Sequence, residues 1–234
     1  MKVFLNWSGG KDAAFCLQKL KETSIPVSAL VTTMNTHTNR ISMHGVCRAL
    51  LEEQARCIGL PLHTVELPGE ASMLLYEEAI HHQNKLLKAE GFSHVASGDL
   101  FLEDLKTYRE KLYARDGIEC LFPIWEKDTG MMLRQFIELG FKALVVCVNA
   151  SVLDKSFCGR MIDESFMDDL PNSVDPCGEN GEYHSFVFDG PVFQRAVPFE
   201  KGELVYREYP APANNKENEN KSTAGFYFCD LLPC

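Results

Sequence analysis

The sequence lacks the paired cysteines of a zinc or redox site, since none of its nine cysteines forms a CxxC pair. Most of them stand singly among apolar neighbours, which favours buried, reduced thiols over a disulfide framework. It also lacks an apolar run of about 18 residues, and Met1 leads into a short strand-like segment with no signal-peptide pattern. We therefore expect no membrane span and a cytoplasmic protein.

Positive charge is in short supply. The chain of 234 residues has 23 Lys and Arg against 33 Asp and Glu, a net charge of -10. A nucleic-acid-binding module held mainly by phosphate contacts is therefore not expected. The rest of the composition is typical of a globular protein, with 45% hydrophobic residues, and the length permits one large domain or two modest ones.

Apolar runs alternate with helical patterns in the first half of the chain. We predict strands at 2–7, 27–33, 62–67 and 93–97, and helices just after residue 10, at 43–58 and at 72–90. This alternation predicts βαβ units and therefore an α/β fold with a Rossmann-like parallel sheet.

The pattern changes after residue 125, where a helix at 129–139 and an apolar strand at 141–148 precede a loop-rich acidic stretch. We expect a first domain at 1–125 and a smaller C-terminal α+β domain at 126–234. Residues 210–224 are polar and have almost no large apolar side chains; their sequence is PAPANNKENENKSTA. They predict a flexible segment.

The stretch VFLNWSGGKDAAF, residues 3–15, places two glycines between a strand and a helix. Loop amides and a helix N-terminus in this order attract anions, and glycines let the backbone approach phosphate oxygens. Ser8 can donate a hydroxyl hydrogen bond, and Lys11 can neutralise charge. Asp12 beside a phosphate implies a shared Mg²⁺. The competing interpretation is a simple glycine turn with Lys11 and Asp12 in solvent.

The SGGKD stretch resembles the pyrophosphate loop of the N-type ATP pyrophosphatases (PP-loop enzymes), whose pattern is S-G-G-x-D-S. The resemblance implies that the loop holds the β- and γ-phosphates of ATP as a leaving group. Attack on the α-phosphorus then gives AMP and pyrophosphate. Ala13 replaces the last serine of the pattern, so one hydroxyl contact to the phosphates is missing.

Five later stretches resemble the diphthine–ammonia ligase family, over residues 2–209. They are MHGV from Met43, SGDL from Ser97, YREKL from Tyr108, LFPIW from Leu121 and CGENGEYHSFVFDGP from Cys177. The resemblance implies that residues 1–125 form an adenine-nucleotide-hydrolase-like, ATP-binding domain and that the smaller domain at 126–234 binds the substrate. It also implies ATP-dependent amidation of diphthine, on elongation factor 2, with ammonium. The polar insert and the loop variant look more like bacterial relatives, whose carboxylate substrate would differ because bacteria lack diphthamide.

The resemblance also implies site residues. Glu179 and Glu182 would grip a cation, which could be ammonium, the trimethylammonium of a diphthine-like substrate or Mg²⁺, and Tyr183 could add a cation–π face. The predicted catalytic residues are Lys11, Asp12, Glu179 and Glu182. The expected contacts to ATP are Ser8, Gly9, Gly10, Lys11, Asp12, Thr32, Thr33, His44, Gly98 and Asp99, with Mg²⁺ at Asp12. The expected contacts to the carboxylate substrate are Arg109, Glu179, Glu182, Tyr183 and His184.

Other interpretations stay open at this point. Two glutamates in a turn are often merely solvated, Arg109 would suit a solvated helix face, and a lone histidine is more often structural. A PP-loop enzyme that modifies tRNA would predict a basic surface and CxxC cysteines. A non-catalytic adenine-nucleotide sensor finds support only in Ala13. A homodimer is also left open.

Overall fold

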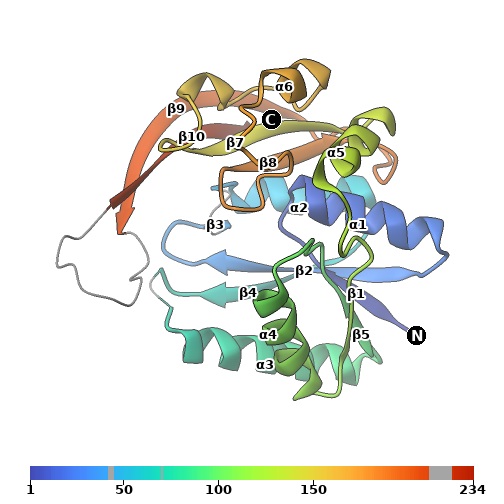
Figure 1. The fold of residues 1–234 in the computed structure, drawn as a ribbon. Coiled ribbons are helices and arrows are strands. Elements are labelled where there is room, and N and C mark those ends of the chain that lie inside the picture. Colours follow the sequence, from blue (N-terminus) through green and yellow to red (C-terminus); the bar gives the residue numbers. More distant parts are fainter. Residues whose placement is uncertain (42–44, 70, 211–222) are drawn as a thin grey trace.

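The computed structural model describes residues 1–41, 45–69, 71–210 and 223–234, and it stacks two sheets with helices between them (Figure 1). From one side to the other, the layers are α3 with α4, the first sheet (sheet A), α1 with α2, and the second sheet (sheet B). None of the described helices is both long enough and apolar enough to cross a membrane.

Sheet A has the order β3-β2-β1-β5-β6, with β4 paired to β2. All of its pairings are parallel except that between β2 and β3. Its strands are β1 (Val3–Asn6), β2 (Val27–Asn35), β3 (Arg40–Ile41), β4 (Leu62–Leu67), β5 (His94–Ala96) and β6 (Glu119–Leu121). The helices around it are α1 (Lys11–Glu22), α2 (Arg48–Ile58), α3 (Met73–Ala89) and α4 (Glu103–Ala114).

Sheet B is antiparallel with the order β8-β7-β10-β9. Its strands are β7 (Lys142–Asn149), β8 (Tyr183–Asp189), β9 (Phe199–Pro210) and β10 (Thr223–Pro233). Around it lie α5 (Thr129–Glu138), the short 3-10 helix η1 (Lys155–Phe157) and α6 (Glu164–Asp169). The α/β class, with a Rossmann-like sheet and a smaller C-terminal α+β part, is confirmed.

Local sequence explains most helix ends. The Ser72 side chain accepts a hydrogen bond from the Leu75 N–H at 3.2 Å and caps α3. Gly59 ends α2 with a φ of 84°. The helix predicted at 43–58 begins only at Arg48, because Cys47 is extended and forms a bridge with Arg40 of β3. Residues 42–44 lie outside the described residues.

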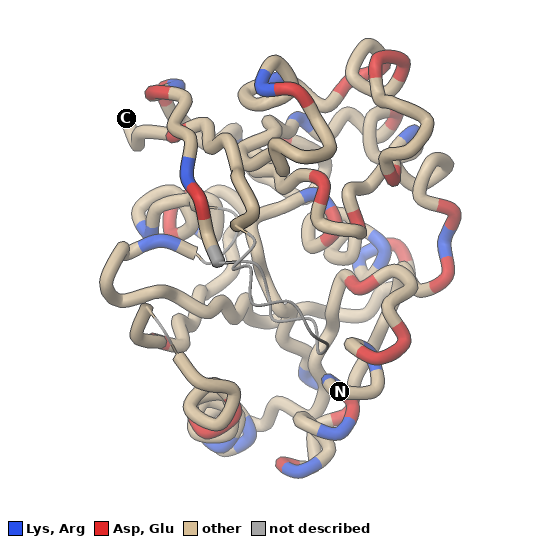
Figure 2. The backbone as a smooth tube through the Cα atoms, turned by 60° about the vertical axis from the view of Figure 1, so that its left-hand side comes forward, with Lys and Arg blue, Asp and Glu red and all other residues tan. Residues whose placement is uncertain are grey.

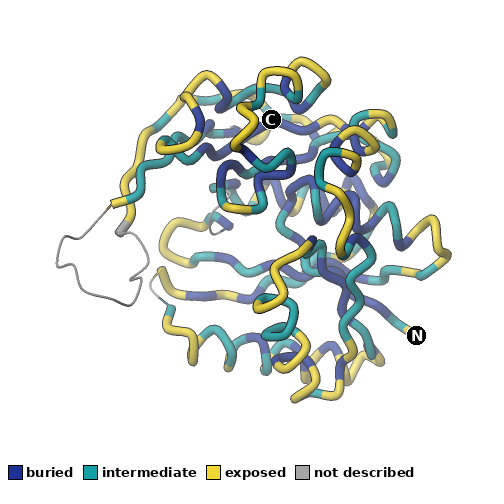
Figure 3. Tube along the Cα trace, viewed as in Figure 1, coloured by how far each residue is buried: buried dark blue, intermediate teal, exposed yellow. Residues whose placement is uncertain are grey.

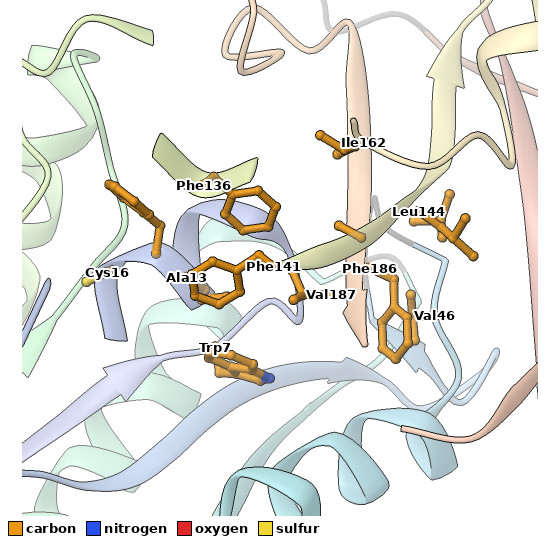
Figure 4. Packing of buried hydrophobic residues seen from close by; sticks show 14 of the residues in the cluster. Trp7, Ala13, Cys16, Val46, Phe136, Phe141, Leu144, Ile162, Phe186 and Val187 are labelled. Atoms are coloured by element: carbon orange, nitrogen blue, oxygen red, sulfur yellow. The ribbon is translucent and has the colours of Figure 1, made fainter. Parts of the chain in front are cut away.

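One hydrophobic core joins the two sheets (Figure 4). Trp7 and Ala13 on the first side pack in the same cluster as Phe136, Phe186 and Val187 on the second. Sheet B therefore rests directly on α1 and on the loop that precedes it. The predicted division into domains at 1–125 and 126–234 stays a prediction. The sheets do change between β6 and β7.

The segment predicted to be flexible, 210–224, overlaps two strand ends. Pro210 pairs with Thr223, and Tyr209 pairs with Ala224. Residues 211–222 lie outside the described residues.

Candidate functional site

A cavity of about 490 Å³ opens at the carboxyl ends of β1 and β5, where sheet A meets residues 177–185 of the second half. Ligands of open α/β sheets commonly bind at this edge. The predicted site residues that line it are Ser8, Lys11, Asp12, Thr32, Thr33, Gly98, Asp99, Arg109, Glu179, Tyr183 and His184. His44 lies outside the described residues. The lining of the cavity does not include Gly9, Gly10 or Glu182.

The glycine loop is held in place by the second half of the chain. Gly9 has a φ of 78°, and a Cβ there would lie 2.9 Å from Leu51 Cδ2, so this position requires glycine. The Gly9 carbonyl accepts hydrogen bonds from the Val187 N–H at 2.9 Å and from Gln54 Nε2 at 3.0 Å. The loop therefore has a fixed backbone before any ligand binds.

Gln54 is a residue that sequence reasoning missed. It is buried on α2, and its Oε1 accepts from Trp7 Nε1 at 2.7 Å while its amide donates to Gly9. The available signal was a polar residue within the apolar face of a predicted helix, beside Leu51 and Ala55. A buried amide at such a position needs partners.

The N-terminus of α1 points into the cavity and is partly capped from sheet B. The Lys11 N–H donates to Ser185 Oγ at 3.1 Å, and the Gly10 N–H donates to Ser8 Oγ at 3.3 Å. Ser8 keeps its own hydroxyl hydrogen to donate. The helix dipole and the remaining first-turn N–H groups favour an anion at this end.

Lys11 is the central positive charge of the cavity. Its side chain is only 3% exposed, and Nζ lies 2.9 Å from Asp12 Oδ2 and 5.1 Å from the centre of the Tyr183 ring. Burial is the largest single effect and acts to lower the pKa of the Lys11 amine, but the Asp12 carboxylate, together with Tyr183, Cys177 and Glu179, prevails over it and the net pKa is raised. Lys11 is therefore charged at any working pH.

Acidic groups face this lysine. Burial raises the pKa of the Glu179 carboxyl to about 8; the Asp12 carboxylate adds to that rise and the Lys11 amine opposes it. Burial likewise raises the pKa of Asp12, against the effect of Lys11. A carboxyl group whose pKa is raised by burial and by a neighbouring carboxylate has too little positive charge nearby to balance its ionised form. The cavity is thus ready for a further cation.

Two buried oxygens in the cavity have neither a hydrogen-bond partner nor an ion-pair partner among the described residues: Asp12 Oδ1 and Thr32 Oγ1. Thr32 is only 3% exposed, so both atoms are placed for a ligand. Mg²⁺ usually takes one or two carboxylates together with substrate phosphates. Asp12 Oδ1, beside the glycine loop, fits Mg²⁺ carried with a triphosphate. The described residues contain no group of three His, Cys, Asp or Glu side chains arranged as a metal site.

A second ion pair forms the opposite wall. Arg109 Nε on α4 lies 2.7 Å from Asp99 Oδ2. Burial is the largest single effect and acts to lower the pKa of Arg109, but Asp99 together with Tyr113 and Tyr76 prevails over it, so the net pKa is raised. Arg109 is therefore not a solvated helix residue. The Asp99 carboxylate balances part of the charge of Arg109 and orients its guanidinium group towards the cavity.

Sequence reasoning also missed a series of hydrogen-bonded polar side chains in the same cavity. The Tyr113 hydroxyl donates to Asn6 Oδ1 at 3.0 Å, and Asn6 Nδ2 donates to Ser97 Oγ at 2.9 Å. Asn6 and Ser97 stand where β1 and β5 end, as Asp99 does. Polar residues at adjacent strand ends were the signal that could have identified them.

Glu182 is placed differently from its prediction. Its carboxylate accepts from the Asp175 N–H at 3.0 Å, the Asn180 N–H at 2.8 Å and Asn180 Nδ2 at 3.1 Å. Burial acts to raise the pKa of Glu182, but these hydrogen bonds prevail and the net pKa is lowered. The Glu182 carboxylate is hydrogen-bonded within its own loop, so of the two glutamates only Glu179 faces the cavity. Glu182 therefore stabilises the loop, and Glu179 is the glutamate whose carboxyl group a ligand could contact.

We expect replacement of Glu179 by Gln to stabilise the unliganded protein at high pH. The native pKa near 8 exceeds the ordinary 4.5, so ionising Glu179 destabilises the fold as pH rises through that interval. The half-buried neutral variant should gain on the order of 1 kcal/mol at pH 8 and nothing at pH 4. Urea unfolding across this pH range, without ATP, measures the difference.

Glu182→Gln is the matched control, with the opposite sign. The lowered pKa of Glu182 means that its ionised form stabilises the fold above its ordinary pKa, and this contribution is lost as pH falls. Glu182→Gln should therefore be less stable than the wild type at pH 8. A Glu179→Gln protein that is less stable than the wild type at pH 8 would contradict the claim that the ionised Glu179 carboxylate destabilises the fold.

Comparison with known proteins gives a consistent family. Residues 1–120 match the Diphthamide synthase N-terminal domain, and residues 128–211 match the Diphthamide synthase C-terminal domain. Together these two matches cover most of the chain.

Curated proteins called diphthine–ammonia ligase are similar to the chain at low identity. That of Schizosaccharomyces pombe is 26% identical over 228 residues, which covers 88% of this chain and 37% of the yeast protein. The Danio rerio and Homo sapiens proteins are 25% and 24% identical, with 89% and 85% of their lengths covered. The chain thus spans well under half of the yeast relative and most of the two vertebrate ones.

Proposed function

The chain belongs to the diphthamide synthase family, and from this premise we propose that it is an ATP-dependent ligase that joins a substrate carboxylate to ammonia through an acyl adenylate. The observation that carries the proposal is the placement of Lys11, Asp12 and Glu179 in one cavity, around a loop whose backbone is fixed. The relatives' name points to diphthine as the carboxylate substrate.

The glycine loop would bind the triphosphate. The Ser8 hydroxyl, the first-turn amides of α1 and the Lys11 amine would contact the β- and γ-phosphates, which leave as pyrophosphate. Asp12 Oδ1 would hold the Mg²⁺ that accompanies these phosphates, and the bound ion would neutralise part of their charge. Thr32 Oγ1 would contact the nucleotide from β2.

The first chemical step would be attack of a carboxylate oxygen on the α-phosphorus. The new P–O bond forms an acyl adenylate as the bond to pyrophosphate breaks. Lys11 would lie beside the position where negative charge grows on the phosphate oxygens. A fixed cation in a desolvated site stabilises such charge without reorganisation. Arg109, oriented by Asp99, would hold the carboxylate substrate on the opposite wall.

The second step would be attack of ammonia on the acyl carbon, with AMP as the leaving group. Ammonium must first lose a proton to become a nucleophile. Ionised Glu179 would bind ammonium and then accept its proton, a role suited to a carboxyl with a pKa near 8. The Tyr183 ring lies beside Lys11, and it would add a cation–π face to this pocket. The balanced reaction turns carboxylate, ATP and ammonium into amide, AMP, pyrophosphate and a proton.

The nucleotide product tests this function. The full chain would be incubated with ATP, Mg²⁺, ammonium and elongation factor 2 that carries diphthine. We expect AMP and pyrophosphate to accumulate in step with the amide. Formation of ADP, or of AMP at the same rate without the carboxylate substrate, would contradict the proposal.

Replacement of Glu182 by Gln is expected to slow amide formation about 10- to 100-fold through the loop that carries Glu179. The carboxylate accepts its three hydrogen bonds through both oxygens, whereas the amide has only one oxygen to accept them, and the loss of charge-assisted bonds costs about 1.5–3 kcal/mol. ATP affinity should stay within a few-fold of wild type, as calorimetry can measure. Because Glu182 acts through Glu179, the pH dependence of the rate should also shift.

Asn180→Ala serves as the control for Glu182. It removes only the 3.1 Å side-chain hydrogen bond to Glu182 and keeps the shorter bond from the Asn180 N–H. Its rate should fall less than that of Glu182→Gln. A Glu182→Gln enzyme with the wild-type rate and pH profile would show that the loop needs no such anchor.

A further inference from the structure

The outer edge of β9 carries exposed apolar side chains. In sheet B this strand pairs with β10 on one side, and among the described residues no strand pairs with its other side. Leu204 is 55% exposed and Tyr206 is 49% exposed. Figure 3 shows β9 as mostly exposed, at the outside of the molecule. Long edges of this kind are templates for pairing with another strand.

The same edge also carries both signs of charge (Figure 2). Glu203 and Arg207 are exposed, and they lie on the face opposite to that of Leu204 and Tyr206 because side chains alternate along a strand. Tyr206 also packs against Tyr227 of β10, with ring centres 5.2 Å apart. One face of the edge therefore carries Leu204 and Tyr206 followed by Glu208, and the other carries Glu203 and Arg207 on either side of Val205.

A two-fold antiparallel pairing of β9 with itself is restricted by geometry. The outward N–H and C=O groups of an edge strand belong to every second residue. Such residues must face one another across the axis, so the two-fold axis passes beside a residue and not between two residues. Axes at Glu203, Leu204, Val205 and Tyr206 are the candidates near the middle of the strand.

Only one of these axes pairs the side chains well. An axis at Glu203 places two glutamates opposite each other, and an axis at Leu204 places Lys201 opposite Arg207. An axis at Tyr206 leaves Leu204 opposite Glu208. An axis at Val205 instead places Glu203 opposite Arg207 twice and Leu204 opposite Tyr206 twice. Opposite charges and apolar pairs across strands stabilise, whereas like charges destabilise.

We propose that two copies of this chain form a two-fold dimer by pairing their β9 strands about Val205, so that the two copies of sheet B become one continuous sheet. The occupant of the edge is a second copy because the strand, paired with itself about Val205, matches opposite charges and apolar side chains. The interface is isologous and closes, so it limits assembly to a dimer. The dimer is independent of the ligase chemistry in the cavity.

Charge reversal tests both the dimer and its register. Sedimentation equilibrium of the full chain between about 1 and 100 μM spans the range of weak specific association, and we expect a concentration-dependent dimer there. Arg207→Glu places two like-charged pairs in the interface, so the dissociation constant should rise about tenfold or more. The double variant Glu203→Arg, Arg207→Glu restores opposite charges and should return it to near the wild-type value.

Arg134→Glu, at an exposed position on α5, makes the same charge change away from the edge and should leave the dissociation constant unchanged. Equal melting temperatures of the variants would show that they fold alike. A wild-type chain that stays monomeric up to 100 μM, on the order of the weakest specific dimers, would overturn the proposal. So would a dimer that Arg207→Glu does not weaken, or one that the double variant fails to restore.

Discussion

Replacing Lys11 with Met is expected to lower the rate of AMP formation by about 10²- to 10³-fold, the usual effect of removing one preorganised group that stabilises transition-state charge. Methionine keeps the length and the apolar contacts of the lysine stem. It removes the positive charge that lies 2.9 Å from Asp12 Oδ2. The affinity for ATP should fall as well, because the phosphates lose their counter-charge.

The same change should alter the titration of the cavity. Lys11 opposes the rise in the pKa of both Asp12 and Glu179, so without it both carboxyls should ionise at higher pH. The residual activity should therefore peak at a higher pH than that of the wild type.

Lys19→Met is the matched control for this prediction. Lys19 lies on the same helix, and its amine pairs with Glu22 at the surface, 2.8 Å away. Its loss should leave rate and affinity near wild type. Steady-state kinetics and calorimetry on both variants measure these effects. A Lys11→Met protein that binds and cleaves ATP like the wild type would remove the glycine loop from the site.

Replacing Gly98 with Ala is expected to damage the site through backbone contact alone. A Cβ at this position would lie 2.8 Å from the carbonyl carbon and the carbonyl oxygen of Asp12. Backbone cannot rotate away as a flexible side chain can, so either β5 or the first turn of α1 must shift. We expect a stability loss of about 1–3 kcal/mol and a marked loss of ATP affinity.

Gly130→Ala makes the same chemical change without the clash, since the nearest atom to its Cβ would be Asp128 Oδ1 at 3.4 Å. It lies in the first turn of α5, where alanine favours helix formation. Urea unfolding and ATP titration should find this variant near wild type. A Gly98→Ala protein with unchanged stability and affinity would show that the contact between β5 and the start of α1 does not shape the site.

Local sequence was enough to predict the parts of the fold that local physics decides. The strand, glycines and helix at the N-terminus follow from apolar periodicity and from the freedom of glycine, and the helix capped by Ser72 has its signal within a few residues. The helix α4 was not delimited in advance, because among its residues only Leu112 and Tyr113 are buried. So few buried positions leave almost no helical periodicity to find.

The site itself depends on contacts between distant parts of the chain, which periodicity does not encode. Ser185 reaches Lys11 over 174 residues of chain, and Gln54 joins Gly9 of the glycine loop to Val187 of β8. The resemblance supplied residues 177–185 as a unit but could not distinguish Glu179 from Glu182. The two stand three apart in one loop, and only the direction of each carboxylate separates a ligand contact from an internal anchor.

The central claim is that a carboxylate attacks the α-phosphorus of ATP in this cavity, and oxygen transfer measures it most directly. The diphthine carboxylate would be labelled with ¹⁸O, and the AMP and pyrophosphate released during amidation would be analysed by mass spectrometry. An acyl adenylate intermediate predicts one ¹⁸O atom in AMP and none in pyrophosphate. Unlabelled AMP, or ¹⁸O in inorganic phosphate released with ADP, would contradict the account.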